Sequence, residues 1–395
     1  RYLCLSKLDM LLEGNDSMQA LMDLYGEEFD DQGLGDQKLY QDMLDELSAG
    51  NWEGDRDDWK SPLLDADWKP LTVDRGQCMG PKCSHFRNCC FYKARDSMDK
   101  ADCIVSNHDL VLTDLALGGG AILPDPEKCI YVFDEAHHLP FKSNNHFSAY
   151  TRVKATSAWL ERSQVLLLRM LKDDFIDGNR QDSLQKLISA TILELEHAWL
   201  LLEQTLESLE HVDSYENRAK HAFKLGVVPV EIQEMASNLS NQFSRLAKAF
   251  EDINDDLKGA MEEGGDVSRR QLAEQWFPLV GSLIGRAEAN LELWLSYAVS
   301  DPSGKPPSAR WLSFNENDSF KDIGLSSSPV LAAENLKERL WQSCAGAVLT
   351  SATLSALGQF DMLKMRAGLP EHTHYLSIPS PFNFATAANL VVPRM

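Results

Sequence analysis

The sequence contains no apolar run approaching the roughly 18 residues that a bilayer-crossing helix needs. Its first residues, RYLCLSKLDM, do not place a basic stretch before a hydrophobic one, so we expect neither membrane insertion nor secretion. Basic residues are scarce: 38 Lys and Arg face 60 Asp and Glu, and the net charge is −22. This balance excludes a protein coated in phosphate-binding charge, because nucleic-acid affinity depends on Lys and Arg.

A third absence concerns nucleotide binding. No GxxxxGK[ST] motif occurs, so the sequence holds no loop that could cradle the β and γ phosphates of a nucleotide. What is present is a globular composition: 44% of the 395 residues are hydrophobic and 25% are charged. At roughly 150 residues per domain, this length predicts two or three packed units.

The periodicity of apolar residues changes near residue 150. Before it, ADCIVSNHDLVLTDL and EKCIYVFDEAHH each carry a compact apolar run typical of a buried strand in a parallel sheet. After it, three stripes repeat every three or four positions and predict a helical bundle whose stripes form the core. They run from Leu184 to Leu209, from Ile232 to Leu257 and from Leu272 to Ala298. Strand character then returns in GAVLTSATLSAL and NLVVP. We therefore expect one α/β domain interrupted by a helical unit.

Two adjacent acids follow the strand CIYVF directly. Asp134 and Glu135, in the sequence DEAH with His137, should emerge at the carboxyl end of that strand, where open α/β sheets bind ligands. An Asp in this position can hold Mg²⁺ on a nucleotide, and a neighbouring Glu can orient or deprotonate the attacking water. The alternative is a helix N-terminus, where both acids would favour the dipole.

A second junction between a strand and a loop lies in VLTSATL. Ser351 and Thr353 have hydroxyls that could bond the DEAH carboxylates or His137. Taken alone, this SAT sequence is more typical of a helix cap. Its place on a second strand favours the interpretation as a partner of DEAH.

Four of the eight cysteines lie within CMGPKCSHFRNCC, namely Cys78, Cys83, Cys89 and Cys90. Such density indicates a metal site, and a fourth ligand could be Cys4, His85 or Cys90. A four-thiolate iron-sulfur cluster and a structural zinc both fit, although the tight Cys-x2-Cys of zinc sites is missing.

Local charge changes sign at these cysteines. Residues 5–77 hold 19 acidic and 6 basic side chains, whereas residues 78–95 hold no acid. Aromatic and basic residues interleave there, as a path for a single DNA strand requires, although a solvated basic face fits equally well. The candidate DNA-binding residues are Lys82, Arg87, Tyr92, Lys93 and Arg95.

The ordered motifs resemble a known family. RYLC, the cysteine group, NHDLVLTDL, DEAHH, a helical insertion, TSAT and SPFNF occur in the order found in the iron-sulfur DNA helicases of superfamily 2, of the DinG and XPD type. The resemblance implies an ATP-dependent 5′-to-3′ DNA helicase with two RecA-like motor domains of the P-loop NTPase type. It also implies an iron-sulfur domain and a helical arch inserted in the first motor domain.

Residue roles follow from the resemblance at matching positions. Cys4, Cys78, Cys83 and Cys89 match the ligands of a 4Fe-4S cluster, although Cys90 replaces a common proline and leaves the choice between Cys89 and Cys90 open. Asp134 and Glu135 match the acids that bind Mg²⁺ with ATP and activate water. His137 matches the residue that couples hydrolysis to movement, and Ser351 and Thr353 fall on motif III.

The resemblance also implies a domain layout. The cluster domain would span residues 1–100, the first motor domain residues 101–150 and 336–395, and the arch residues 151–335. The P-loop would lie before Arg1 and the second motor domain after Met395, so we expect no ATP hydrolysis by this chain alone. Implied partners are ATP, single-stranded and forked DNA and a single-strand DNA-binding protein. The protein would be a monomer in the bacterial cytoplasm, associated with the nucleoid and without membrane contact.

Two rival hypotheses come from other classes. The first is a zinc-dependent nucleic-acid-binding module without a motor, which metal and sulfide analysis would distinguish. The second is an interaction protein that docks partners through its helices and uses DEAH only as a helix cap.

Overall fold

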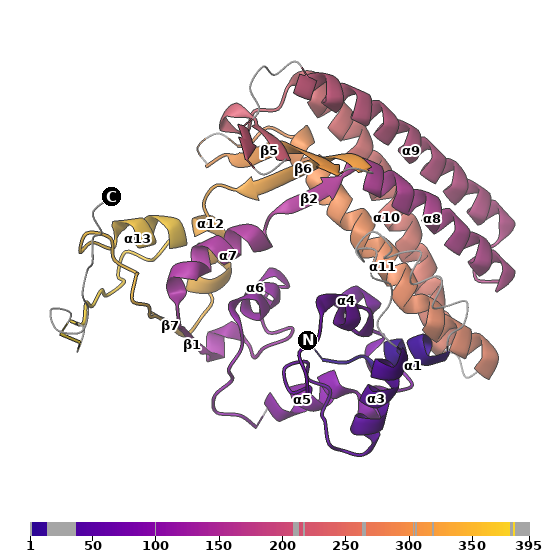
Figure 1. Ribbon diagram of the computed structural model, residues 1–395, viewed down its shortest axis with the longest axis horizontal. Coiled ribbons are helices and arrows are strands. Elements are labelled where there is room, and N and C mark those ends of the chain that lie inside the picture. Colours follow the sequence, from indigo (N-terminus) through magenta and orange to yellow (C-terminus); the bar gives the residue numbers. More distant parts are fainter. Residues whose placement is uncertain are drawn as a thin grey trace, which may run out of the picture. The chain divides into compact units, whose positions relative to one another are not determined.

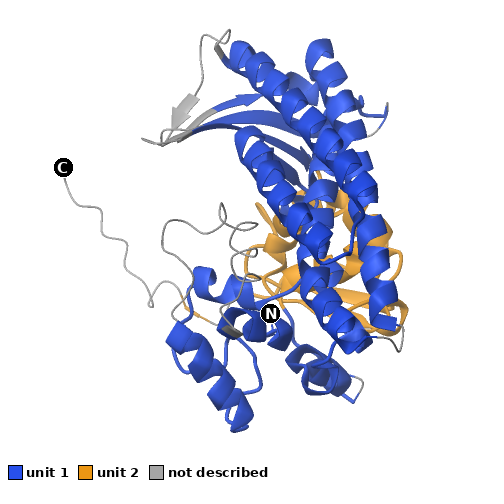
Figure 2. Ribbon diagram, turned by 90° about the vertical axis from the view of Figure 1, so that its right-hand side faces the viewer, with its two compact units in different colours: residues 1–106, 144–330 blue, residues 107–143, 331–395 orange. Residues whose placement is uncertain are grey.

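The computed structural model describes residues 2–13, 37–98, 100–207, 213–215, 218–262, 266–302, 304, 306–317, 320–379 and 382–383 (Figure 1). The expected strand NLVVP and most of the SPFNF motif lie outside these residues. The chain divides into two units, coloured separately in Figure 2. Unit 1 comprises residues 1–106 and 144–330, and unit 2 comprises residues 107–143 and 331–395.

Unit 2 is built around two parallel strands that are distant in the sequence. Strand β1 (Ile130–Phe133) pairs with β7 (Gly346–Leu349), with Ile130 opposite Gly346 and Phe133 opposite Leu349. This pairing confirms that strands before and after the helical region belong to one parallel sheet. The helices of this unit include α6 (His108–Ala116), α7 (Leu139–His146), α12 (Ala333–Leu336), a π-helical turn (Lys337–Trp341) and α13 (Asp361–Ala367). The last residues of α7 are counted in unit 1.

One expected strand is a helix. The segment ADCIVSNHDLVLTDL contains α6, because the Asn107 side chain accepts a hydrogen bond from the Leu110 main-chain N–H at 2.8 Å and caps the helix. The buried residues Val111, Leu112 and Leu115 follow helical spacing. The strand prediction was therefore wrong because it counted apolar residues without weighing the Asn cap.

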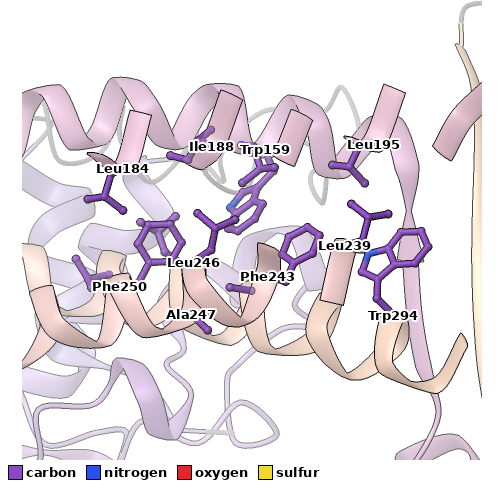
Figure 3. Close-up of a cluster of buried hydrophobic side chains, with 14 of the residues drawn as sticks. Trp159, Leu184, Ile188, Leu195, Leu239, Phe243, Leu246, Ala247, Phe250 and Trp294 are labelled. Carbon is purple, nitrogen blue, oxygen red and sulfur yellow. The ribbon is translucent and has the colours of Figure 1, made fainter. Parts of the chain in front are cut away.

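Long helices dominate unit 1. They are α8 (Val153–Lys172), α9 (Gly178–Glu207), α10 (Val230–Glu262) and α11 (Val267–Ala298). The last three contain the three predicted stripes, except for Leu209, which lies outside the described residues. Figure 3 shows part of the core that they enclose, where Leu184 and Ile188 of α9 lie near Phe243 and Phe250 of α10. Each large apolar side chain buried in this way contributes about 1.5–3 kcal/mol. None of the helices in the described residues has the length and apolar content needed to span a membrane.

The helical unit also contains a sheet that the sequence analysis did not predict. Five antiparallel strands lie in the order β2-β6-β5-β4-β3. They are β2 (Ala149–Arg152), β3 (Asp213–Tyr215), β4 (Arg218–Ala222), β5 (Ser308–Asn317) and β6 (Phe320–Pro329). Strand β6 reads FKDIGLSSSP, and its Ser, Gly and Asp content has low strand propensity, so only pairing with neighbours establishes it.

The N-terminal part of unit 1 has its own apolar core. Helices α1 (Leu5–Glu13), α3 (Gln37–Ser48), α4 (Asp65–Trp68) and α5 (Cys90–Met98) are joined by short 3₁₀ turns, among them Arg75–Gln77, Gly80–Lys82 and Phe86–Asn88. Trp52 lies at the centre of this core, with its ring centroid 4.7 Å from that of Trp59 and 6.2 Å from that of Trp68. These edge-on aromatic pairs stabilise the core beyond simple burial.

The cysteine-bearing segment packs on α11. Gly281 faces the Gly76 carbonyl so closely that an added Cβ would lie 2.3 Å from the oxygen. Lys82 forms an ion pair with Glu262 of α10, and the Arg270 side chain donates a hydrogen bond to the Lys82 carbonyl at 3.3 Å. The 3₁₀ turns around the cysteines are therefore anchored on the bundle.

This contact predicts opposite outcomes for two glycines of α11. We expect Gly281→Ala to lower the free energy of unfolding by about 1–3 kcal/mol, because the methyl group would collide with the Gly76 carbonyl. Gly285→Ala is the matched control, since its Cβ would enter open space and should raise stability by up to about 1 kcal/mol. Urea unfolding followed by circular dichroism compares the two. Equal midpoints for the two variants would contradict the close approach.

Candidate functional site

The two acids that follow β1 and the hydroxyl-bearing residues that follow β7 lie together at one end of the parallel strand pair. Asp134 and Glu135 follow β1, and Thr350 and Ser351 follow β7. Main-chain hydrogen bonds continue past the strands, from the Thr350 N–H to the Phe133 carbonyl at 2.9 Å and from the Ala136 N–H to the Thr350 carbonyl at 3.0 Å. The parallel pairing therefore places both loops at the carboxyl edge.

Hydrogen bonds connect the two loops through their side chains. The Thr350 hydroxyl donates to Asp134 at 3.2 Å, and the Ser351 hydroxyl donates to Glu135 Oε2 at 2.7 Å. His137 Nδ1 lies 2.7 Å from Ser351 Oγ and 3.1 Å from Glu135 Oε2. Because the Ser351 proton is directed at Glu135, the proton between Ser351 and His137 must belong to Nδ1. Thr353 contacts Ser351 at 3.4 Å between their hydroxyl oxygens and completes the group.

The backbone at Glu135 is strained. Its φ is 47°, a left-handed conformation that is uncommon outside glycine. Both acids remain exposed to solvent. A strained turn that presents two exposed carboxylates, one of them tied to a serine and a histidine, can bind a divalent cation or position a water molecule.

The four predicted cluster cysteines lie close enough together to influence one another. Burial raises the pKa of the Cys4 thiol to about 12, with Cys83 and Cys78 adding to the rise. Burial also raises the pKa of Cys83, to which Cys78 and Cys89 contribute. Within the described part of the chain, no group of three or more His, Cys, Asp or Glu side chains converges tightly enough to hold a metal ion.

Hydrogen-bond donors point at three of these sulfur atoms. The Lys7 main-chain N–H donates to Cys4, and the His85 main-chain N–H donates to Cys83. Burial raises the pKa of Tyr92, and the charge of Cys78 and the hydrogen bond that the Tyr92 hydroxyl donates to Cys78 add to the rise. Donors of this kind stabilise thiolates more than thiols, so they suit sulfur atoms that ligate a metal.

The structure separates the candidate ligands that the sequence left open. Cys90 is 3% exposed and packs in the tryptophan core, where its Sγ would lie 2.4 Å from a Cβ added to Gly54. His85 Nε2 lies 2.9 Å from an Asp9 carboxylate oxygen. Cys89 contributes to the raised pKa of Cys83 and also to that of its neighbour Cys90. Cys90 and His85 thus have other surroundings, and the choice of Cys4 and Cys89 as ligands stays a prediction.

The predicted DNA-binding residues have different surroundings. Arg87 and Lys93 are exposed, whereas the Lys82 ammonium is paired with Glu262. Tyr92 contacts the rings of Phe86 and Phe91, with centroid distances of 4.6 and 5.3 Å, and binds Cys78. Arg95 is half-buried and lies close enough to Tyr92 to oppose the rise of its pKa. Binding of DNA by these residues stays a prediction.

Sequence reasoning missed Lys7. Its side chain is 1% exposed, and burial lowers the pKa of its ammonium to about 8, while Cys4 and Asp74 oppose that shift. A signal was present, because Leu11 falls four residues after Lys7 on the same helix face and Leu3 lies four residues before it, just ahead of the helix. A lysine in line with two buried leucines is unusual and marks a charge held inside the core.

Several known proteins are similar to this chain in sequence. No protein-family model matches the sequence. The chain is 30% identical over 397 residues to the ATP-dependent DNA helicase DinG of Photobacterium profundum, and all of the chain and 55% of that protein are covered. It is 26% identical over 399 residues to the protein of the same name in Escherichia coli (strain K12) and in Salmonella typhimurium, with all of the chain and 54% of each relative covered. The chain thus spans about half the length of the curated relatives it matches. The resemblance to DinG-type helicases that the motifs indicated is confirmed.

The thiol environment predicts slow alkylation of Cys4. With a pKa of about 12, only about one Cys4 thiol in 10⁴ is ionised at pH 8 in the metal-free protein. We therefore expect iodoacetamide to label exposed Cys103 well before Cys4, with Cys4 labelling rising as pH increases. Peptide mass spectrometry over a pH series measures both rates. Labelling of Cys4 as fast as that of Cys103 at pH 8 would contradict the burial described here.

Proposed function

We propose, from the whole-length similarity to DinG-type helicases, that the chain is part of an ATP-dependent helicase that moves 5′ to 3′ on single-stranded and forked DNA. The observation that best supports this proposal is the hydrogen-bond network that joins Glu135, Ser351 and His137 across two parallel strands. In this proposal Asp134 binds Mg²⁺ with ATP, and Glu135 activates the attacking water. Ser351 and His137 relay the state of Glu135 to the rest of the motor.

Exposed apolar side chains on the strand pair support a larger motor domain. Ile130 is 72% exposed, Val132 is 67% exposed and Val348 is 49% exposed. Parallel strands are normally covered on both faces, and a two-stranded sheet is marginal on its own. These residues therefore suit a sheet extended by further strands, as a RecA-like motor domain would provide.

We also propose that Cys4, Cys78, Cys83 and Cys89 bind a 4Fe-4S cluster. A tetrahedral Zn²⁺ with bonds of ~2.3 Å needs its sulfurs about 3.8 Å apart, whereas a cluster holds its thiolates on separate irons. The proposal is supported by the interaction of Cys4 and Cys83 with the other thiols of the set and by the match of all four positions to the cluster ligands of the resembled family. The cluster would supply folding energy by closing the chain between Cys4 and Cys78. The relatives, all named as helicases, do not favour the zinc-module alternative.

A substitution of the acidic pair tests the motor proposal. In the full-length protein, Glu135→Gln should lower DNA-stimulated ATP turnover by roughly 10²–10⁴-fold, because the amide cannot accept a proton from water. Asp109→Asn serves as the control, since this exposed acid pairs with Lys142 on the same unit and should leave turnover near the wild-type rate. Wild-type turnover by Glu135→Gln would favour a helix-capping role and the rival docking hypothesis.

Adjacent cysteines give a matched pair for the cluster. We expect Cys89→Ser, prepared without oxygen as full-length protein, to lose iron and acid-labile sulfide, because a cluster thiolate is removed. Cys90→Ser should keep both, although it loses stability in the tryptophan core. Iron, zinc and sulfide analysis per chain measures the outcome. One zinc without sulfide in the wild type would overturn the cluster assignment, and iron loss only in Cys90→Ser would exchange the two roles.

A further inference from the structure

The five-stranded sheet of unit 1 has one side that faces the helical bundle and one that faces away from it (Figure 1). Helices α8 and α11 pack on the first side, where Leu312, Ile323 and Leu325 are fully buried in the bundle core. Thr151 of β2 points to the same side, since its hydroxyl donates to Asn290 of α11 at 2.8 Å. Because side chains alternate along a strand, the neighbours of these residues project from the opposite side, which we call the outer face.

Two aromatic side chains lie in one row across the outer face. The register places Tyr150 of β2 opposite Ser326 of β6, and Ser326 opposite Trp311 of β5. Neighbouring strands are about 4.8 Å apart, so the two aromatic residues stand about 10 Å apart with a serine between them. Tyr150 is 52% exposed and Trp311 is half-buried. The row therefore presents two flat rings on either side of a small residue.

The next row on the outer face has a basic residue at each end. Its members, from β2 to β4, are Arg152, Gly324, Ser313 and Lys220. A Cβ added to Gly324 would lie 2.9 Å from the Tyr150 hydroxyl oxygen and 2.6 Å from Ser313 Oγ, so the Tyr150 side chain extends across this row. Lys220 is exposed. The outer face thus combines aromatic rings with cations over small side chains.

Negative charge is scarce on the outer face. Among the outer side chains that the structure describes, the one acid is Asp322, which is fully buried. Its carboxylate accepts hydrogen bonds from the main-chain N–H groups of Lys154, Ala155 and Ile323 at 2.9, 3.0 and 2.8 Å, and so it caps the start of α8. Exposed charge on the described outer face is therefore positive, in a chain whose net charge is −22.

Rings and cations in adjacent rows select a ligand by its chemistry. Nucleic-acid bases stack on aromatic rings, and the phosphates between them pair with lysine and arginine. Antiparallel sheets that carry aromatic residues on neighbouring strands stack successive bases of a single strand in this way. An acidic peptide would use the cations alone, and duplex DNA keeps its bases stacked inside the helix.

We propose that the outer face of this sheet binds single-stranded DNA, with bases stacked on Tyr150 and Trp311 and a phosphate paired with Lys220. The proposal rests on the proposed function, because it names a second contact for the strand along which the motor would move. It adds to the candidate DNA-binding residues of the cysteine segment, which lie in the N-terminal part of unit 1.

Photocrosslinking of the wild-type full-length protein tests the surface without any substitution. An oligothymidylate with 5-iodouracil at several positions is bound, irradiated and digested together with the protein. We expect crosslinked peptides that contain Tyr150 or Trp311, because iodouracil couples to an aromatic ring stacked on it. Crosslinks elsewhere in the protein and none within residues 149–152 or 308–313 would overturn the proposal.

A pair of Tyr150 variants measures the contribution of the ring. Fluorescence anisotropy of a labelled oligothymidylate gives the Kd of each full-length variant. Tyr150→Ala should bind about tenfold more weakly, because one stacked base is lost, whereas Tyr150→Phe keeps the ring and should bind within about twofold of wild type. Both should bind a blunt duplex of equal length as tightly as wild type does. Wild-type single-strand affinity in Tyr150→Ala, or equal weakening in both variants, contradicts stacking on this ring.

The salt dependence of binding tests the lysine. Lys220→Met removes a phosphate contact, so the slope of log K against log salt should become shallower by about 0.7 for a single strand. Lys186→Met is the matched control, because it removes an exposed lysine of α9 and should leave the slope unchanged. Equal slopes in the two variants would overturn the phosphate contact.

The outcomes separate this proposal from the function on which it rests. A wild-type full-length protein that neither binds single-stranded DNA nor shows DNA-stimulated ATP turnover overturns both. DNA-stimulated turnover in wild type, without crosslinks on the sheet and with wild-type affinity in Tyr150→Ala, overturns the outer-face proposal alone.

Discussion

Cys4 and the cysteines of residues 78–89 are far apart in the sequence, and the N-terminal core is what holds them together. The Leu3 N–H donates to the Gly54 carbonyl at 2.9 Å, and the Cys4 N–H donates to the Leu71 carbonyl at 2.8 Å. These bonds fix the first residues between two segments of the tryptophan core. The other cysteines are fixed by the anchoring of Gly76 on Gly281. A cluster bound at these thiols would join the N-terminal core to the helical bundle, so strain in either part would reach the other.

The acidic site is assembled by the same principle, with a sheet in place of a core. Strands β1 and β7 are separated by the whole of the helical insertion, yet their pairing brings Ser351 to within 2.7 Å of Glu135. The loop containing Ser351 cannot move along the strand axis without losing the hydrogen bond between the Thr350 N–H and the Phe133 carbonyl. A signal from the acidic pair would therefore pass first to β7 and the segment that follows it, which is the role that motif III would require.

The elements that depend on local periodicity could be predicted from the sequence. The stripes of α9, α10 and α11 could be predicted because every third or fourth residue faces one core, and the acids after β1 because a strand ends in polar residues. The β5–β6 hairpin could not be predicted, because its Ser-rich strands form only through pairing with their neighbours. The different surroundings of Cys89 and Cys90 were equally hidden. Adjacent cysteines have the same composition and spacing, and only the packing of Cys90 against Gly54 distinguishes them.

The two sites differ in how much of their electrostatic environment exists before a ligand binds. Asp134 and Glu135 are exposed, so water solvates them until a cation or nucleotide arrives. Cys4 and Cys83 instead disfavour the thiolate form, because burial raises the pKa of both. Metal binding must therefore release protons from these thiols, which opposes binding. The Lys7 N–H, the His85 N–H and the Tyr92 hydroxyl offset that cost, since they are already oriented toward the sulfur atoms and need no rearrangement when thiolates form. If the cysteines bind the proposed cluster, these preset donors would stabilise the thiolates, whereas the acidic site depends on what its ligand brings.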